Sequence, residues 1–169
     1  MKTTRRTFLG AGLFAGLSVG LGSLVAATSR ATLAEPAEHF EVMHSDAEWR
    51  SLLSASSYAV LRQEATERPY SSPLNEQHRA GVFTCAGCAR PLFSSTTKFD
   101  SHTGWPSFWR PLPNAVLTRE DKTFGMLRTE VHCQRCGGHL GHLFDDGPKP
   151  TGLRYCMNGA AMNFTESTT

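Results

Sequence analysis

The sequence predicts a mainly β fold, in which a short N-terminal helical arm precedes a domain of antiparallel strands. Helical periodicity is confined to residues 45–65. After residue 80, short apolar runs alternate with Gly, Pro, Asn and Asp, which is the pattern of short strands joined by turns. The length of 169 residues is enough for one domain with a hydrophobic core and too short to expect two.

The helical arm is expected to contain two short helices. Residues 45–48 read Ser-Asp-Ala-Glu, a capping box in which the serine and the glutamate satisfy backbone N–H groups at a helix start. A second helix is expected over residues 57–65, before the chain is interrupted by Pro69 and Pro73. The apolar side chains expected on the inner faces of these helices are Trp49, Leu52, Leu53, Tyr58 and Leu61.

The strands are expected where short apolar runs lie between turn residues. These runs are 82–83, 91–93, 116–117, 126–131, 140–144 and 153–157. The short turn-rich connections between them favour antiparallel pairing, because parallel strands need long crossovers.

The first 34 residues are expected to be an export signal and not part of the fold. Two consecutive arginines precede an apolar run over residues 8–27, which is the order of charged and apolar regions in a signal peptide. The stretch TRRTFLG is typical of the bacterial twin-arginine route, and cleavage after Ala34 fits the small-residue rule. We therefore expect residues 35–169 to form a single domain in the periplasm, with an uncleaved membrane anchor as the alternative.

The charge balance changes when the signal is set aside. The segment carries four of the 17 basic residues and none of the 15 acidic ones, which leaves 13 basic and 15 acidic residues, a net charge of −2. Binding to a phosphate backbone requires clustered basic residues. Nucleic acid is therefore not an expected partner, and any membrane contact is expected through the signal segment alone.

Four of the five cysteines form two C-x-x-C pairs, Cys85/Cys88 and Cys133/Cys136. Two such turns can present four thiolates as a tetrahedron, which predicts one structural zinc ion per chain. Disulfides, which are common in exported proteins, and thioredoxin-like redox pairs are the alternatives. Neither pair opens a helix in a βαβ pattern, and the twin-arginine route passes folded proteins that have already received a metal, so zinc is favoured. Gly87 and Gly137 are expected to relax the two turns.

Cys156 remains unpaired, and its neighbours are polar. On a strand, Arg154, Cys156 and Asn158 would share one face, because alternate side chains point to the same side. A nearby cation lowers the pKa of a thiol, so this arrangement predicts an activated cysteine. A buried inert thiol is the alternative.

Histidines and a tryptophan supply matching chemistry in two other stretches. His139 and His142 would face opposite sides of a regular strand, but Gly141 favours a bulge that re-aims one of them. Such histidines can give a proton near neutral pH, hold a metal or simply fill the core. Asp146 can orient Arg154 or a histidine, or merely form a turn. Trp105 lies in a Gly- and Pro-rich loop, where its indole can receive a small apolar group or pack beneath the loop.

Five motifs occur along the chain: TERPYSSPLN, FDSHTGWPSF, GHLGHLFDDGP, RYCMNGAAMNF and the two C-x-x-C pairs, one on each side of FDSHTGWPSF. Together they resemble the B-class peptide-methionine sulfoxide reductases, from about residue 45 to residue 164. The resemblance implies two antiparallel sheets in a β-tent-like arrangement, a zinc-knuckle site on the four paired cysteines, and reduction of methionine-R-sulfoxide, free or in proteins. One enzyme class serves each sulfoxide epimer.

The resemblance also implies roles for individual residues. Cys156 matches the nucleophile, which becomes a sulfenic acid, and His142 matches the proton donor, with His139 beside it. Trp105 matches the residue that receives the substrate methyl group. The polar frame of the pocket matches Asp146 and Arg154, which contact substrate, and Asn158, which belongs with the catalytic residues.

One position departs from many members of the family. Thr103 stands where they carry a resolving cysteine, directly before the Gly-Trp-Pro. An external thiol, such as a thioredoxin-like protein, is therefore expected to reduce the sulfenic acid. The competing functions are a thiol-disulfide oxidoreductase that uses a C-x-x-C pair and a zinc-ribbon interaction module.

Overall fold

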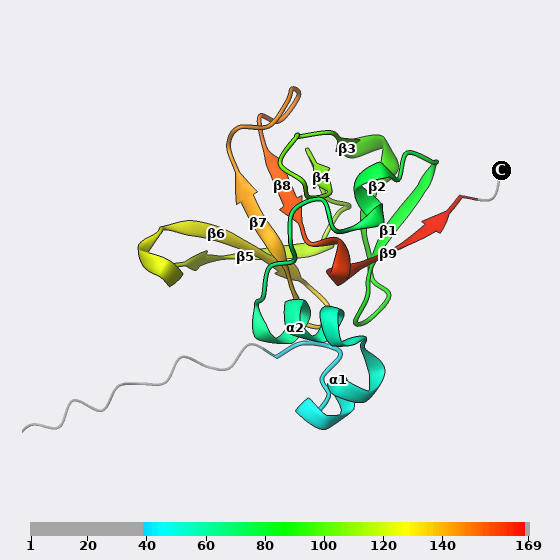
Figure 1. Cartoon of the computed structure of the whole chain (residues 1–169), viewed down its shortest axis with the longest axis vertical. Helices are drawn as coiled ribbons and strands as arrows, with labels where there is room; N and C mark the ends of the chain where they lie inside the picture. The colour runs from blue at the N-terminus through cyan, green and yellow to red at the C-terminus, as the bar shows by residue number, and fades with distance from the viewer. Residues whose placement is uncertain (1–38, 168–169) are drawn as a thin grey trace, which may run out of the picture. The chain divides into compact units, whose positions relative to one another are not determined.

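The computed structural model describes residues 39–167 of the chain (Figure 1). The export signal expected over residues 1–34 lies outside this range, so the export route and the membrane anchor stay predictions. Within residues 39–167, no helix has the length and apolar character needed to cross a membrane.

Two short helices form the predicted N-terminal arm, α1 (Asp46–Leu52) and α2 (Ala55–Gln63). The capping box is present as predicted, with the Ser45 side chain accepting from the backbone of Glu48 and the Glu48 carboxylate accepting from the backbone of Ser45. The buried side chains are Trp49 on α1 and Tyr58, Val60 and Leu61 on α2.

Leu52 does not face the core as predicted, because its side chain is 61% exposed. The helix spans two turns, and Leu53 already has extended backbone geometry at the C-cap. A helix this short turns one narrow face inward, and Trp49 takes that face. Leu53, just past the helix, packs against the core from outside.

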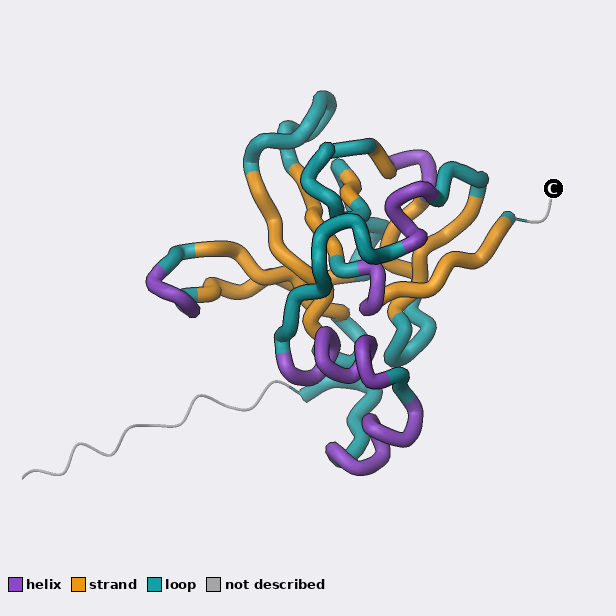
Figure 2. The backbone as a smooth tube through the Cα atoms, in the orientation of Figure 1, coloured by secondary structure: helices purple, strands orange, loops and turns teal. Residues whose placement is uncertain are grey.

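The strands form two antiparallel sheets, which confirms the predicted fold class (Figures 1 and 2). The three-stranded sheet has the order β2 (Pro91–Ser94), β1 (Gly81–Cys85), β9 (Met162–Glu166). The six-stranded sheet has the order β3 (Lys98–Phe99), β4 (Ser107–Phe108), β8 (Arg154–Met157), β7 (His139–Phe144), β6 (Arg128–Cys133), β5 (Val116–Asp121). Residues 39–167 also contain four 3₁₀ turns: η1 (Pro73–Glu76) before the first strand, and η2 (Ser95–Thr97), η3 (Thr123–Gly125) and η4 (Gly159–Ala161) between strands.

Three strands were not predicted, namely β3, β4 and β9. The first two have two residues each, too few for any periodicity to show, and their partners in the sheet define them. The apolar run 126–131 also differs, because β6 begins at Arg128. Met126 and Leu127 are exposed where η3 closes the β5–β6 hairpin, whose tip projects to the left in Figure 1.

Aromatic side chains join the two sheets. The Phe93 ring stacks on Phe108 with centroids 4.3 Å apart, and Phe83 meets Phe108 edge-on at 4.9 Å. All three are fully buried, and burying one such side chain contributes about 1.5–3 kcal/mol. Phe83 and Phe93 belong to the smaller sheet and Phe108 to the larger one. Their packing therefore fixes β4, and with it the neighbouring strand β8.

Candidate active site and metal centre

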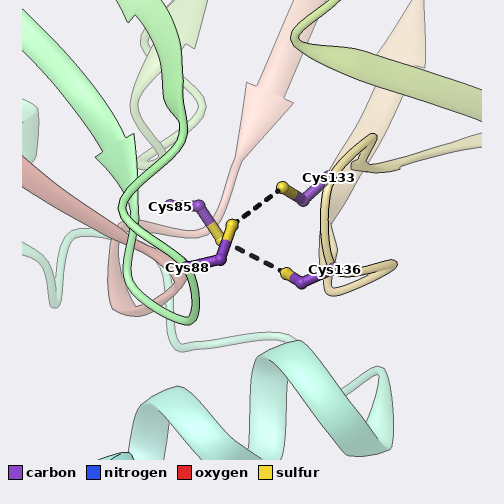
Figure 3. A group of neighbouring side chains, drawn as sticks. All are labelled: Cys85, Cys88, Cys133 and Cys136. Atoms are coloured by element: carbon purple, nitrogen blue, oxygen red, sulfur yellow. Dashed lines mark hydrogen bonds between the residues drawn. The ribbon is translucent and has the colours of Figure 1, made fainter. Parts of the chain in front are cut away.

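The four paired cysteines converge on one point between the sheets (Figure 3). Their sulfur atoms all lie within 4.8 Å of one another, with Cys85 Sγ 3.7 Å from Cys136 Sγ and Cys88 Sγ 3.5 Å from Cys133 Sγ. A tetrahedron of thiolates with zinc–sulfur bonds of about 2.3 Å has edges of about 3.8 Å. The four residues therefore fit a tetrahedral zinc ion.

The alternative uses of these cysteines fit the geometry less well. A disulfide requires about 2.05 Å between sulfurs, and all four cysteines are free. A C-x-x-C redox pair brings together the two sulfurs of one motif, whereas the close contacts here join one motif to the other. The arrangement is one that could hold a metal ion.

The protonation of the four thiols points the same way. Contact with Cys136 lowers the pKa of Cys133, and contact with Cys133 raises the pKa of Cys85. The pKa values of the four thiols therefore divide, falling for Cys133 and Cys88 and rising for Cys85 and Cys136, because like charges so close together repel. A divalent cation at the centre is what allows all four to ionise together.

The two turns that carry the cysteines use different residues. Gly137 has φ +67°, a left-handed conformation that favours glycine, as predicted. In the other turn, Ala89 holds the positive φ of +57°, and Gly87 has ordinary contacts with Leu61 and Trp49 at 3.5 Å. The prediction that Gly87 relaxes its turn was therefore wrong, since the strained position falls two residues later.

Cys156 lies in the middle of the six-stranded sheet, where four neighbouring strands supply its polar surroundings. Directly paired residues form one row across β4, β8, β7, β6 and β5. The row is Ser107, Cys156, His142, Glu130 and Arg119. Since paired residues in antiparallel strands point to the same face, the row places a hydroxyl, a thiol, an imidazole, a carboxylate and a guanidinium side by side.

A β-bulge brings the second histidine to this face, as the sequence predicted. Val131 pairs with Gly141 and His132 pairs with His139, so Leu140 is an additional residue on β7. The His139 and His142 rings then lie with their centroids 5.4 Å apart. A Cβ atom on Gly141 would overlap the backbone oxygen of Cys156. The glycine therefore permits the close approach of β7 to β8.

Each histidine pairs with its own carboxylate. His139 Nδ1 lies 2.7 Å from Glu130 Oε1, both buried, and Arg119 contacts the other oxygen of Glu130. His142 Nε2 lies 2.8 Å from Asp121 Oδ2. These two acidic partners were not predicted from the sequence, because they lie on β6 and β5, nine and 21 residues away from their histidines.

The pKa values around the histidines follow from these contacts. Hydrogen bonds from Thr123 and His142 hold the pKa of Asp121 well below its usual range. Burial lowers the pKa of His142, and the hydrogen bond to Asp121 offsets part of that effect. The imidazole is thus held in place by an ionised carboxylate while its own proton is weakly bound.

A pocket of about 150 Å³ opens over Cys156. Its walls are Thr66, Trp105, Arg128, Gly141, His142, Phe144, Cys156 and Asn158. The structure thus brings four predicted site residues together: the thiol, the proton-donor candidate, the tryptophan and Asn158. The larger hollow of about 410 Å³ beyond His142 is lined mostly by charged and polar side chains and does not include the thiol.

Three predicted site residues, namely Arg154, Asp146 and His139, do not line the pocket but contact residues that do, directly or through one another. Arg154 donates to Asp146 through two hydrogen bonds of 2.8 Å each, and its guanidinium lies over the Phe144 ring at 4.2 Å. Of the partners considered for Asp146, the structure selects Arg154. His139 contacts His142 edge-on and lines the neighbouring hollow.

The predicted decrease in the pKa of Cys156 is wrong for the protein without substrate. Burial raises the pKa of this thiol and outweighs the opposing effects of Thr103, Arg154 and Ser107. The charge of Arg154 is neutralised by Asp146, which limits what the cation can do for the sulfur.

Glu67 organises the pocket in a way that the sequence did not reveal. Its carboxylate accepts hydrogen bonds from the backbone N–H groups of Gly159 and Ala160, at 2.5 and 2.9 Å. Its backbone N–H donates to Asn158 Oδ1 at 3.0 Å, and its carbonyl accepts from Trp105 Nε1 at 3.1 Å. Glu67 lies in the TERPYSSPLN motif, which was the available signal, but its partners are 38 to 93 residues away.

Comparison with known proteins places the chain in a family. The SelR domain matches residues 53–166. A protein of Agrobacterium fabrum named peptide methionine sulfoxide reductase MsrB is 52% identical over 125 residues, which cover 73% of this chain and 93% of the relative. Proteins of the same name from Bradyrhizobium diazoefficiens and Methanosarcina mazei are 54% and 49% identical, over 72% and 75% of this chain and 88% and 91% of the relatives. On this match the chain belongs to the SelR domain family.

Proposed function

We propose that the protein reduces methionine-R-sulfoxide, free or in peptides and proteins, to methionine. The observation that carries the proposal is the thiol of Cys156, which lines a small pocket together with His142, Trp105 and Asn158. Membership of the SelR domain family and the names of the relatives support the same reaction.

The proposed chemistry transfers one oxygen atom from substrate to thiol. The Cys156 thiolate attacks the sulfoxide sulfur while a proton from His142 goes to the sulfoxide oxygen. The attack forms a bond between the two sulfurs, and the protonated oxygen stays on the substrate sulfur. The hydroxyl then moves to the Cys156 sulfur as the S–S bond and the substrate S–O bond break, which releases methionine and leaves Cys156 as a sulfenic acid. Two external thiols then return the cysteine to its reduced form and yield one disulfide and one water.

The other pocket residues position the substrate in this proposal. Trp105 presents its indole to the S-methyl group, and the hydrogen bond to the Glu67 carbonyl fixes the ring. Asn158 is held by Leu140 and Glu67 at the edge of the pocket. Asp146 holds Arg154, whose charge favours the Cys156 thiolate against the effect of burial.

Cys85, Cys88, Cys133 and Cys136 would hold one structural zinc ion in this proposal. Four thiolates complete a tetrahedral coordination and leave no open position for water or substrate. The metal therefore supplies folding energy and not chemistry.

Recycling is proposed to depend on an external thiol, such as a thioredoxin-like protein. Thr103 Oγ1 lies 3.9 Å from Cys156 Sγ, so the side chain in the place of a resolving cysteine touches the sulfur. The variant Thr103→Cys is expected to form a disulfide with Cys156 after oxidation by peroxide. Non-reducing peptide mapping would detect the bond, and its absence would count against this geometry.

The activity test uses the full chain and its Cys156→Ser variant. Each is incubated with racemic methionine sulfoxide and dithiothreitol, and the epimers are separated by chiral chromatography. Loss of the R epimer alone, abolished in the variant, is the expected result. If the zinc-loaded protein left both epimers unchanged, the zinc-ribbon interaction module would become the better hypothesis. Zinc bound to all four paired cysteines would block their thiols and would exclude a thiol-disulfide oxidoreductase that uses a C-x-x-C pair.

We further propose that the protein is exported to the periplasm by the twin-arginine route, on the basis of TRRTFLG near its start. Replacing Arg5 and Arg6 by lysine is expected to retain the protein in the cytoplasm. Cell fractionation tests this, and recovery in the membrane fraction with the signal intact would support the anchor instead.

A further inference from the structure

Three hydroxyl groups form a continuous chain that ends at the Cys156 sulfur. Ser107 Oγ donates to the backbone oxygen of Trp105 at 3.1 Å, and it lies 2.7 Å from Ser101 Oγ. Ser101 Oγ lies 2.8 Å from Thr103 Oγ1, which in turn lies 3.9 Å from Cys156 Sγ. Ser107 is completely buried and pairs directly with Cys156 across β4 and β8, so its side chain lies beside the sulfur on the same face of the sheet.

A count of protons shows that the hydrogen bonds between these hydroxyl groups can run in either of two directions. Each hydroxyl has one proton to donate. If Ser107 donates to the Trp105 oxygen, Ser101 must donate to Ser107 and Thr103 must donate to Ser101. In that direction, Thr103 has no proton left for the sulfur, and Cys156 itself donates its S–H to Thr103. All four contacts are then satisfied with Cys156 as a neutral thiol.

When Cys156 loses its proton, it can no longer donate a hydrogen bond to Thr103. A thiolate can only accept, so the last contact is kept only if Thr103 turns its proton toward the sulfur. Ser101 then donates to Thr103 and Ser107 donates to Ser101. The hydrogen bond from Ser107 to the Trp105 oxygen is given up in exchange. The same direction serves an anionic sulfenate, which is also an acceptor.

We propose that Ser101, Thr103 and Ser107 form a reversible hydrogen-bond chain that turns toward Cys156 when its sulfur becomes anionic. Thr103 is the donor to the sulfur, and the two serines are positioning residues that hold it turned away in the thiol state. The inference deepens the proposed function, because it names the groups that stabilise the anionic nucleophile. It also links the state of the sulfur to the backbone of Trp105, which carries the pocket's indole.

The free energies of the hydrogen bonds that are gained and lost predict whether each residue favours or opposes the Cys156 thiolate. A hydrogen bond to a charged group contributes about 1.5–3 kcal/mol, more than the roughly 0.5–1.5 kcal/mol of the neutral bond that is lost. Mutual polarisation along the hydrogen-bond chain adds about 10–30% of the energy of one bond, which is smaller than either of these contributions. Thr103 should therefore favour the thiolate, and Ser101, which holds Thr103 turned away, should oppose it. Ser107 has two opposing effects, because it supports the thiol state through Ser101 and also lowers the pKa of Cys156 directly.

Other charged and polar groups also lie around the Cys156 sulfur. Arg154 on β8 favours the thiolate, while His142 on β7 and Arg128 on β6 line the same pocket. On β4, the residue opposite the sulfur is Ser107, which carries no charge. The 3.9 Å contact of Thr103 is long, and charge-assisted hydrogen bonds are shorter than neutral ones, so it is expected to shorten in the thiolate.

The test measures the alkylation of Cys156 by iodoacetamide as a function of pH in the full zinc-loaded chain, without substrate. Mass spectrometry of the peptide that contains Cys156 separates its reaction from that of the metal-binding cysteines. Thr103→Val removes the hydroxyl at nearly constant shape and is expected to raise the apparent pKa and slow alkylation at pH 7 about tenfold. Thr103→Ser, which keeps the hydroxyl, is expected to stay within about twofold of the wild type.

The Ser101→Ala variant tests the proposal by the direction in which the apparent pKa of Cys156 changes. It breaks the chain while Thr103 stays free to donate, so the apparent pKa is expected to fall and alkylation at pH 7 to increase about two- to fivefold. Slower alkylation in Ser101→Ala, in the same direction as in Thr103→Val, would overturn the reversible chain. An unchanged pKa in Thr103→Val would overturn it as well. Alkylation needs no sulfoxide reduction, so these outcomes are independent of the proposed activity.

Discussion

The protein contains two kinds of cysteine site, and the contrast between them shows how packing decides what a thiol does. In the metal centre, four sulfurs lie within 4.8 Å of one another, and each one that ionises works against the others. In the pocket, Cys156 is a single thiol faced by hydroxyls, an imidazole and a guanidinium. Both sites are largely buried, so the difference lies in the neighbours of the sulfur and not in its exposure to water.

The difference teaches that ionisation is supported by different means at the two sites. The metal centre needs a cation from outside the protein to hold four negative charges. The pocket relies on donors within the chain, which burial opposes in the protein without substrate. A change at the first site should therefore affect folding, and a change at the second should affect reactivity first.

The largest expected effect comes from Cys133→Ser. This side chain is fully buried, and its loss leaves three thiols that no longer complete a tetrahedron. Structural zinc contributes on the order of 10–16 kcal/mol, which is comparable to the stability of a whole domain. We expect the variant to lose zinc and its cooperative thermal transition, measured by metal analysis and circular dichroism.

Cys156→Ser is the matched control for this variant. It also removes one thiol, but no metal ligand, so it is expected to keep its zinc and to unfold close to the temperature of the wild type. If Cys133→Ser unfolded as cooperatively as Cys156→Ser, the four cysteines would not be a stabilising metal site, and the contrast between the sites would fail.

The second effect concerns the backbone that carries Cys156. In Gly141→Ala the new methyl group overlaps the Cys156 carbonyl oxygen, so β7 and β8 must separate. We expect a loss of about 3 kcal/mol in the free energy of unfolding, measured with urea, and a strong decrease in activity at full zinc content.

Gly152→Ala serves as the control for that prediction. Gly152 has φ +73° but open space where a Cβ would lie, so the cost is the backbone strain alone, about 1–2 kcal/mol. Equal losses in the two variants would show that the approach of β7 to β8 is not tight.

The third prediction concerns the hydrogen bonds by which Glu67 holds the segments around the pocket. Glu67→Gln replaces one carboxylate oxygen by an NH₂ group, which faces a backbone N–H of Gly159 or Ala160 instead of accepting from it. We expect a loss of about 1–2 kcal/mol in unfolding free energy and an increased KM, since Asn158 and Trp105 contact the same segment. An unchanged KM would show that Glu67 supports the fold but not the pocket.

The smallest expected effect is the pH dependence of the alkylation rate of the Cys156 thiol in the wild-type protein. Burial raises the pKa of this thiol, so less thiolate is present at a given pH than in free cysteine, and alkylation at pH 7 should be a few-fold slower. The rate should increase as the pH rises through a pKa above about 8.5. A plateau reached below pH 8 would mean that Arg154 dominates, as the sequence alone suggested.

Features decided by neighbouring residues were predicted well. The capping box at Ser45 and Glu48, the inward side chains Tyr58 and Leu61 and the bulge at Gly141 depend on a few consecutive residues, whose backbone preferences are local. Leu52 was misjudged because α1 is too short to turn a second side chain inward, and Gly87 was misjudged because the positive φ of its turn falls on Ala89.

The sequence by itself determined the two-sheet fold class, the family, the four metal-site cysteines and the separate thiol at Cys156, because spacing and motif order carry that information. The tertiary structure alone decided that Glu130 and Asp121 hold the histidines, that Glu67 braces the pocket, and that the pKa of Cys156 is raised. The physical reason is that desolvation and hydrogen-bond partners depend on which strands pack together. No local pattern in one strand records the residues that another strand places opposite it.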